Sequence, residues 1–267
     1  AFCLDENTQL HDKRATPYVE AAILSAKTWQ ERTGVNVVIH VVSSKVNILT
    51  TSPVQRLEAL GVLVKPVLSI QSIGCPTTAQ IVRMGAYVHS EVEDDDTVII
   101  SDCDAFPVSK RVLDPLQEFS SKRVWVWQHI WSEQSGYTFP LSFIAMRARD
   151  WKTIFECEFP LDPACFTHWN SRSSPEPNSP KYQWGLDQRI VTRALLERQL
   201  CSVKNPMPWQ RVGLDYRPFD DSKTCFHGNE THRHADMEPK RQWIHMLRTS
   251  TIANVKDALS SSVPTKE

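Results

Sequence analysis

Two aspartates, Asp102 and Asp104, stand one residue apart directly after the short apolar run Val98–Ile100. A β-branched run of this kind is typical of a strand buried on both faces of a parallel sheet. In open α/β sheets ligands bind at the carboxyl ends of the strands, and residues at i and i+2 of an extended chain share one face. Both carboxylates are therefore expected to face a ligand, and a hard divalent cation such as Mg²⁺ or Mn²⁺ would relieve their repulsion. A solvated acidic turn is the alternative interpretation.

Alternating strands and helices lead up to this pair of aspartates. Thr16-Pro17 combines a helix N-cap residue with a proline in the first turn, and Ser52-Pro53 begins a second helix. Gly34 and Gly61 are well placed to end the two helices. Pro107 is expected to break regular structure after the aspartates. The alternation predicts a parallel α/β sheet with right-handed crossovers. The predicted strands are 1–4, 35–42, 62–67 and 98–100, and the predicted helices are 16–33, 52–60 and 77–91.

The pattern changes in the second half of the chain. The polar segment 168–181 contains Pro175, Pro177 and Pro180, which favours a mobile loop. An amphipathic helix is predicted to follow residues 182–188 and to run through residue 200. The other predicted elements are strands at 123–129 and 140–146, a short helix at 151–156 and a last strand at 201–203.

Composition excludes several classes of function. Of the 267 residues, 41% are hydrophobic and 23% are charged, which is ordinary for a globular domain. The net charge is −1, from 30 basic and 31 acidic residues spread along the chain. This charge distribution does not indicate nucleic-acid binding. No run approaches the roughly 18 apolar residues of a membrane span. The start at Ala1 rather than at a methionine suggests a trimmed or processed protein, from which an amino-terminal anchor could be missing.

A strand–helix half that ends in a DxD motif, followed by a mixed half, resembles the GT-A class of nucleotide-sugar glycosyltransferases. The segment Ala79–Met84 resembles the helix of that class that carries a basic residue, here Arg83, toward the nucleotide sugar. Trp184–Gln188 resembles the motif that opens the acceptor-side helix, and Cys225–Gly228 resembles the late histidine that completes the metal site. The resemblance covers most of residues 1–230. It implies an α/β, GT-A-like fold: a Rossmann-like half with a central, mostly parallel sheet, and a mixed second half.

The resemblance also implies an organisation and an activity. A single catalytic domain would span 1–258, with a nucleotide-sugar-binding half at 1–108, an acceptor-binding half at 109–258 and a disordered tail at 259–267. The implied activity is metal-dependent transfer of a hexose or pentose from a nucleotide diphosphosugar to a hydroxyl of a glycan, protein or other glycoconjugate. A UDP-sugar is favoured because DxD enzymes usually use one; GDP stays open, as does the choice between retention and inversion. The loop 168–181 would line the acceptor side and become ordered with substrate.

The implied metal site contains three residues. Asp104 would bind the cation directly, while Asp102 would contact the ribose or reach the metal through water. His227 would supply a nitrogen ligand, which favours Mn²⁺ over Mg²⁺. Negative charge grows on the diphosphate leaving group during transfer, and a cation held by carboxylates neutralises it.

The donor and the acceptor would be handled by other residues. Arg83, and Ser43 at the end of the second strand, would contact the nucleotide sugar. Asp187 would be the general base in an inverting enzyme; in a retaining enzyme Asp187 and Gln188 would stabilise the oxocarbenium-like sugar and orient the acceptor. The simpler interpretations are that Asp187 is a first-turn carboxylate favoured by the helix dipole and that Arg83 lies on a solvated helix face.

Two other classes of protein remain as alternatives. A haloacid-dehalogenase-like phosphatase also places its nucleophile in a DxD after an apolar strand, but it needs Thr or Val where this chain has Phe106. A non-catalytic carbohydrate-binding domain is supported by the aromatic residues alone. A separate zinc site at Cys225, His227, His232 and His234 lacks the usual pair spacing.

Cysteines and one sequon bear on the cellular compartment. The seven cysteines form no CxxC pair, so one or two disulfides are compatible with the sequence. The resemblance favours the Golgi or another secretory lumen, with Cys201 or Cys225 in a disulfide; a cytoplasmic or viral enzyme would keep all seven reduced. Asn229-Glu230-Thr231 is the only sequon in the chain and lies two residues past His227. A lumenal enzyme must therefore turn Asn229 away from the site.

Overall fold

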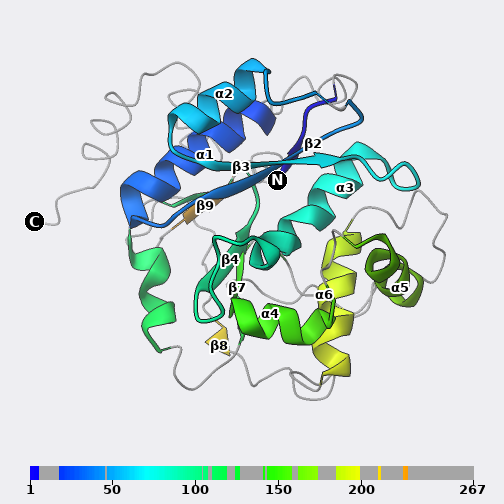
Figure 1. The fold of residues 1–267 in the computed structure, drawn as a ribbon. Coiled ribbons are helices and arrows are strands. Elements are labelled where there is room, and N and C mark those ends of the chain that lie inside the picture. Colours follow the sequence, from blue (N-terminus) through cyan, green and yellow to red (C-terminus); the bar gives the residue numbers. More distant parts are fainter. Residues whose placement is uncertain are drawn as a thin grey trace, which may run out of the picture.

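The computed structural model covers the first half of the chain almost continuously and the second half in parts (Figure 1). The predicted strand 201–203 and the tail 259–267 lie outside the described residues, and the division into halves at residue 108 stays a prediction. The described residues are 1–5, 18–45, 47–103, 105–107, 110–118, 124–126, 141, 143–157, 162–173, 185–198, 210–211 and 225–227.

The first part of the chain forms an α/β unit around a three-stranded parallel sheet, which confirms the predicted fold class. β1 and β3 flank β2, and both pair with it in parallel, with Phe2 opposite Val41 and Val38 opposite Leu63. Figure 1 shows α1 and α2 on one side of this sheet and α3 on the other. The elements are β1 (Phe2–Cys3), α1 (Tyr18–Thr33), β2 (Val38–Ser43), α2 (Ser52–Ala59), β3 (Leu63–Leu68) and α3 (Gly74–Val82).

Local sequence signals explain where these helices end. Gly34 (φ 76°) and Gly61 (φ 74°) follow α1 and α2 in the left-handed conformation that glycine adopts without strain. The third helix differs from its prediction, because α3 gives way to the 3-10 helix η2 (Arg83–Val88) instead of continuing to residue 91. Gly85 lies inside η2, and glycine is a poor residue for the interior of an α-helix.

The strand that leads to the aspartates belongs to a second, mixed sheet. The sequence predicts a parallel partner for this strand, but β4 pairs antiparallel with β7. Val98 and Ile100 are buried whereas Ile99 is only partly buried, and such alternation suits an antiparallel strand. The strands of this sheet, in spatial order, are β4 (Thr97–Ser101), β7 (Phe143–Arg147), β6 (Val124–Val126) and β8 (Gln210–Arg211).

Helices α4, α5 and α6 pack around the second sheet, and one of them corrects the sequence analysis. The predicted loop 168–181 is wrong for its first residues, since α5 runs to Ser173; residues 174–181 lie outside the described chain. Asp162 caps this helix by accepting a hydrogen bond from the Ala164 N–H (2.9 Å), and Pro163 opens it. The three helices are α4 (Ala148–Phe155), α5 (Pro163–Ser173) and α6 (Leu186–Glu197).

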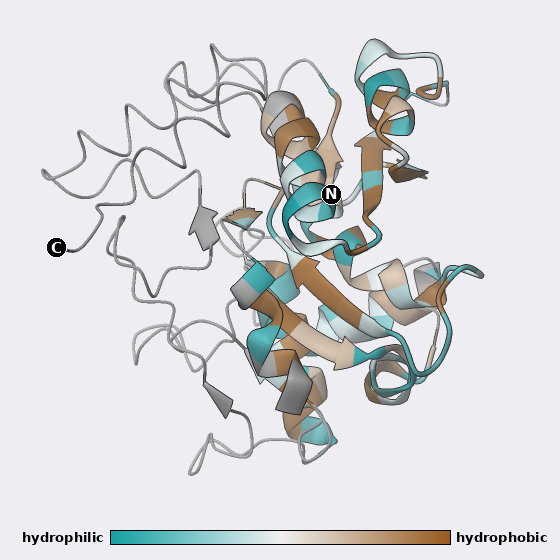
Figure 2. Cartoon of the chain, turned by 90° about the vertical axis from the view of Figure 1, so that its left-hand side faces the viewer, coloured by the Kyte–Doolittle hydropathy of each residue, from teal (hydrophilic) through white to brown (hydrophobic). Residues whose placement is uncertain are grey.

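The core is divided between the two sheets. Under the parallel sheet, α1 and α2 pack aliphatic side chains around Val41, Val54 and Leu57, which are fully buried. Beside the second sheet, Tyr87 and Trp151 stack with a ring separation of 6.3 Å within a larger aromatic cluster. Figure 2 shows the corresponding strands largely in the brown of hydrophobic residues.

A short antiparallel pair follows the aspartates. β5 (Ala105–Pro107) pairs with β9 (Cys225–His227), with Ala105 opposite His227. Pro107 was expected to break regular structure; it is the last residue of β5, so the strand includes the proline and ends there. A proline at the end of a short strand removes no hydrogen bond that the pairing needs.

Four of the seven cysteines form two disulfides, Cys3–Cys75 and Cys157–Cys165. The first joins β1 to α3, and the second joins the end of α4 to α5. Cys103 is a thiol of intermediate exposure. Within the described residues, no helix has both the length and the apolar character needed to cross a bilayer.

Candidate active site

Arg83 is the centre of the candidate site, and its position follows from the junction of two helices. It is the first residue of η2, and its Nε donates to the Gln80 carbonyl oxygen at 3.2 Å, which fixes the start of the side chain. The guanidinium then donates in two directions, from Nη1 to Asp102 Oδ1 and from Nη2 to Asp187 Oδ2. Three predicted site residues that lie up to 104 positions apart in the sequence are thus in direct contact.

Arg83 and the two carboxylates that it binds, Asp102 and Asp187, form a fork of three charged groups. The side chains of these groups are shielded from water to different degrees. The side chain of Asp187 is 1% exposed and that of Arg83 11%, while Asp102 keeps 26% of its surface open. Buried charges persist only when they are paired. Burial opposes the charged form of Arg83, but the carboxylates of Asp102 and Asp187 outweigh it and raise the pKa of the guanidinium above its ordinary value. The fork therefore holds one cation and two anions at the carboxyl end of β4.

Asp187 is held by its own helix as well as by Arg83. It lies in the first turn of α6, and its Oδ1 accepts the N–H of Gln188 at 2.8 Å. Gly185 precedes the helix with φ 72°, a left-handed conformation that sets the direction in which α6 starts. Both carboxylate oxygens are thus engaged by protein donors. Asp187 is a first-turn carboxylate, as the simpler interpretation has it, but it also binds Arg83. The solvated helix-face interpretation does not describe Arg83, because its side chain is 11% exposed.

The predicted metal ligands are brought together only in part within the described residues. Asp104 lies outside them, and of His227 only the backbone is described. That backbone pairs with Ala105, the residue that follows Asp104, although 122 positions separate the two partners in sequence. Cross-strand partners have Cα atoms about 4.5–5.5 Å apart. The topology therefore places His227 beside the end of the DxD motif.

Ser43 has a different partner from the residues of the Arg83 fork. It is 2% exposed at the carboxyl end of β2, and its hydroxyl donates to Asp5 Oδ1 at 2.9 Å. The Ser44 N–H also donates to Asp5, at 3.1 Å. The carboxylate of Asp5 thus lies at the carboxyl edge of the parallel sheet, where ligands bind in folds of this kind. The sequence analysis missed Asp5, although it follows the first predicted strand in the same way as Asp102 follows β4.

Another group of possible ligands lies close to Asp5. Among the residues described by the structure, one set of three metal-binding side chains converges, namely Cys3, Asp5 and Cys75. The two cysteines form a disulfide and are not thiolate ligands. This set is therefore a structural crosslink beside a carboxylate and not a metal centre.

Comparisons with known proteins find likeness among solved structures and none in sequence. No protein family matches the chain, and no curated protein matches its sequence. A similar solved structure is the galactosyltransferase LgtC in complex with donor and acceptor sugar analogs, which has 12% sequence identity and a TM-score of 0.45. The alignment covers 94% of this chain and 96% of that chain. A functional assignment therefore rests on the arrangement of the site residues.

Proposed function

We propose that the protein is a metal-dependent glycosyltransferase that moves a sugar from a nucleotide diphosphosugar, most suitably a UDP-sugar, to a hydroxyl of a glycan, protein or other glycoconjugate. The observation that carries this proposal is the fork in which Arg83 binds Asp102 and Asp187. It unites the strand that bears the DxD motif with the helix that opens on Asp187-Gln188. A charged, shielded cluster at the end of a strand suits a reaction in which charge develops on a leaving group.

Asp104, Asp102 and His227 are the residues that would hold the cation. The donor set of two carboxylates and an imidazole fits Mn²⁺ better than Mg²⁺. The pairing of β5 with β9 brings the backbone of His227 next to that of Ala105, the residue after Asp104. Asp102 is the most exposed member of the fork, with 26% of its side-chain surface accessible. When bound, the cation would neutralise charge on the diphosphate leaving group.

Arg83 would have two tasks in this mechanism. Its charge offsets the two carboxylates in a shielded site, and its two ion pairs link the end of β4 to α6. The guanidinium also lies beside the strand end where the diphosphate is expected to bind. A lysine at this position would keep the charge but could not bind two carboxylates in a fixed planar geometry.

Asp187 is better placed to orient groups than to accept a proton. Its two oxygens already accept hydrogen bonds, one from Arg83 and the other from the Gln188 N–H. We propose that Asp187 holds Arg83 and positions Gln188 and the sugar. This role suits a retaining reaction more than an inverting one.

The test is a panel of UDP- and GDP-sugars incubated with the enzyme in Mn²⁺, with nucleotide release as the signal. Glycosyl transfer or slow donor hydrolysis that stops with EDTA and returns with Mn²⁺ is expected. Arg83→Lys should lower the rate strongly, whereas Arg149→Lys, a change at an exposed ion pair, should not. Phosphate release from phosphomonoesters would instead support the phosphatase alternative, and no turnover at all would support a binding domain.

We also propose that the protein works in the Golgi or another secretory lumen. The support is the pair of disulfides Cys3–Cys75 and Cys157–Cys165, because disulfides persist in oxidising compartments. The two disulfides among the described cysteines use four of the seven in the sequence, so thiol titration of the denatured natural protein should give three thiols or one. Seven titratable thiols would contradict the proposal. The expected partner of Cys201 or Cys225 and the position of Asn229 lie outside the described residues.

A further inference from the structure

Helix α1 places a buried polar side chain against the strand that follows the DxD motif. Ser25 is 5% exposed, and its hydroxyl donates a hydrogen bond to the carbonyl oxygen of Ala105 at 2.7 Å. The two residues are 80 positions apart in the sequence. A buried carbonyl is costly unless a donor reaches it, so this contact joins α1 to the first residue of β5.

The other hydroxyl groups of α1 bond within their own helix. Thr28 donates to the carbonyl oxygens of Leu24 and Ser25, at 3.0 and 2.9 Å. Thr33 donates to the carbonyl oxygen of Trp29. Bonds to a carbonyl three or four residues back are a common use of serine and threonine hydroxyls inside helices. The hydroxyl of Ser25 bonds a different element, which indicates a role outside α1.

Ala105 lies at the meeting point of the proposed metal ligands. It follows Asp104 directly in the sequence, and it is fully buried. Its N–H donates to the Asp102 carbonyl oxygen at 3.1 Å, and its backbone pairs with that of His227. A displacement of Ala105 would therefore change the position of the DxD motif relative to His227.

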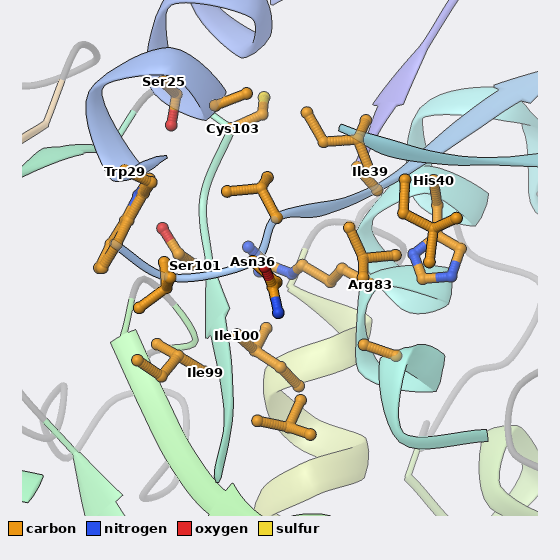
Figure 3. A pocket seen from close by; sticks show the side chains of 18 of the residues that line it. Ser25, Trp29, Asn36, Ile39, His40, Arg83, Ile99, Ile100, Ser101 and Cys103 are labelled. Carbon is orange, nitrogen blue, oxygen red and sulfur yellow. The ribbon is translucent and has the colours of Figure 1, made fainter. Parts of the chain in front are cut away.

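The surroundings of this contact make the hydrogen bond important for its geometry. A cavity of about 630 Å³ borders α1 here, and Ser25, Trp29 and Cys103 are among the residues that line it (Figure 3). Trp29, one helical turn after Ser25, belongs to the same buried apolar cluster as Ala105. Apolar contacts have no preferred direction, and atoms beside a cavity have room to shift. A hydrogen bond fixes both distance and direction, so the Ser25 hydroxyl can set the position of the Ala105 carbonyl.

We propose that Ser25 is a positioning residue for the cation site: its hydroxyl holds Ala105 so that Asp104 and His227 can bind one ion. This role rests on the proposed function, because the cation and its ligands are those of the proposed glycosyl transfer. Loss of a group that holds metal ligands in place typically weakens metal binding by about 10–100-fold. Because Ser25 acts on the backbone and not on a ligand side chain, the lower end of this range is expected.

The test compares variants of Ser25 with a matched variant of Thr28. Ser25→Ala removes the donor, whereas Ser25→Thr keeps the hydroxyl beside a cavity that has room for the added methyl group. Thr28→Ala removes from the same helix a hydroxyl whose hydrogen bonds are to α1 itself. Ser25→Cys supplies only a weak donor and keeps the test open if Ser25→Ala does not fold.

The main readout is nucleotide binding and not turnover. Isothermal titration with UDP, and in parallel with GDP, over a series of Mn²⁺ concentrations gives the Mn²⁺ concentration for half-maximal binding. Ser25→Ala should raise this concentration about tenfold. Ser25→Cys should raise it less, and Ser25→Thr should restore most of the affinity. Thr28→Ala should leave it unchanged.

The thermal midpoint of each variant separates positioning from stability. A serine with a purely structural role would lower the midpoint and leave the Mn²⁺ requirement unchanged, so an unchanged requirement in Ser25→Ala would overturn the role of Ser25 and leave the proposed function standing. An equal rise in Thr28→Ala would also overturn it, because any disturbance of α1 would then have the same effect. Absence of Mn²⁺-dependent nucleotide binding in the unchanged protein would overturn the metal site of the proposed function and the role of Ser25 with it.

Discussion

A cluster of three charged residues lies at each end of β4, and the two clusters have opposite ratios of acidic to basic side chains. At the amino end one carboxylate, Asp95, binds two arginines, of which Arg149 is the nearer at 2.6 Å. At the carboxyl end one guanidinium, Arg83, binds the two carboxylates of Asp102 and Asp187. Exposure separates the two clusters, since the Asp95 side chain is 72% exposed and that of Asp187 is 1% exposed.

Exposure decides what each cluster can contribute. Exposed ion pairs add about 0–1 kcal/mol, because water already solvates both partners. A buried pair is strongly destabilised when one partner is removed, although the intact pair adds little to stability compared with apolar packing. A buried fork such as that of Arg83 is therefore poorly explained by stability and better explained by a site that needs charges in fixed positions.

The largest effect is expected from Arg83→Ala. The change leaves Asp187 buried beside an empty space, which should cost about 3–5 kcal/mol of unfolding free energy and abolish sugar transfer. Urea unfolding and nucleotide release measure the two effects. Arg83→Lys is the conservative variant, which should still fold because it keeps the positive charge, but which loses the two-carboxylate fork. A loss below about 1 kcal/mol in Arg83→Ala would show that the fork does not form in solution.

Asp187→Asn should have a smaller effect on stability. The shape of the side chain is kept, but Arg83 then faces a neutral amide, and hydrogen bonds to charged groups contribute about 1.5–3 kcal/mol. Transfer should fall by about 10²-fold or more, the size typical of losing one preorganised charge from an active site. If Asp187 were a general base, the residual rate would rise with pH or with added small bases. A flat pH profile for the residual rate supports the orienting role.

Asp104→Ala should affect activity alone. Removing one of two neighbouring like charges costs little stability, whereas loss of the direct metal ligand should abolish transfer and Mn²⁺-dependent nucleotide binding. Isothermal titration with UDP, with and without Mn²⁺, separates the two properties. Asp94→Ala is the matched control, because Asp94 forms an exposed pair with Lys152 at 2.6 Å. Near wild-type turnover of Asp104→Ala at saturating Mn²⁺ would refute the metal assignment.

Sequence patterns predicted the local elements of the fold better than their pairing. Gly34 and Gly61 end helices as expected, because their effect depends on neighbouring residues alone. The pairing of β5 with β9 joins two three-residue strands that are far apart in the chain, and segments so short carry no periodicity. Asp162-Pro163 carries the same N-cap and proline signal as Thr16-Pro17, but the sequence analysis does not predict a helix there.

In the candidate site too, local features were predicted better than long-range contacts. Residue type and spacing identified Arg83, Asp102 and Asp187 separately, but no local pattern predicts that one guanidinium binds both carboxylates across 104 positions. Ser43 illustrates the converse, because its position at a strand end was predicted while its hydrogen bond to Asp5 was not. Long-range contacts depend on how α6 packs, which the sequence analysis left undetermined.

The smallest effect is expected at the exposed cluster, and salt makes the comparison decisive. Arg149→Ala should change unfolding free energy by about 0.5 kcal/mol or less, because the Arg149 side chain is 56% exposed and alanine suits the helix α4 that it occupies. At 1 M salt the Debye length falls to about 3 Å, so the contribution of the exposed pair should vanish. The cost of Arg83→Ala should persist at the same salt, since ions do not reach a fork whose inner carboxylate is 1% exposed. Urea unfolding of both variants at about 0.05 M and 1 M salt tests this difference. Equal salt sensitivity in the two clusters would mean that the Arg83 fork is solvated, and the argument for a buried, preorganised site would fail with it.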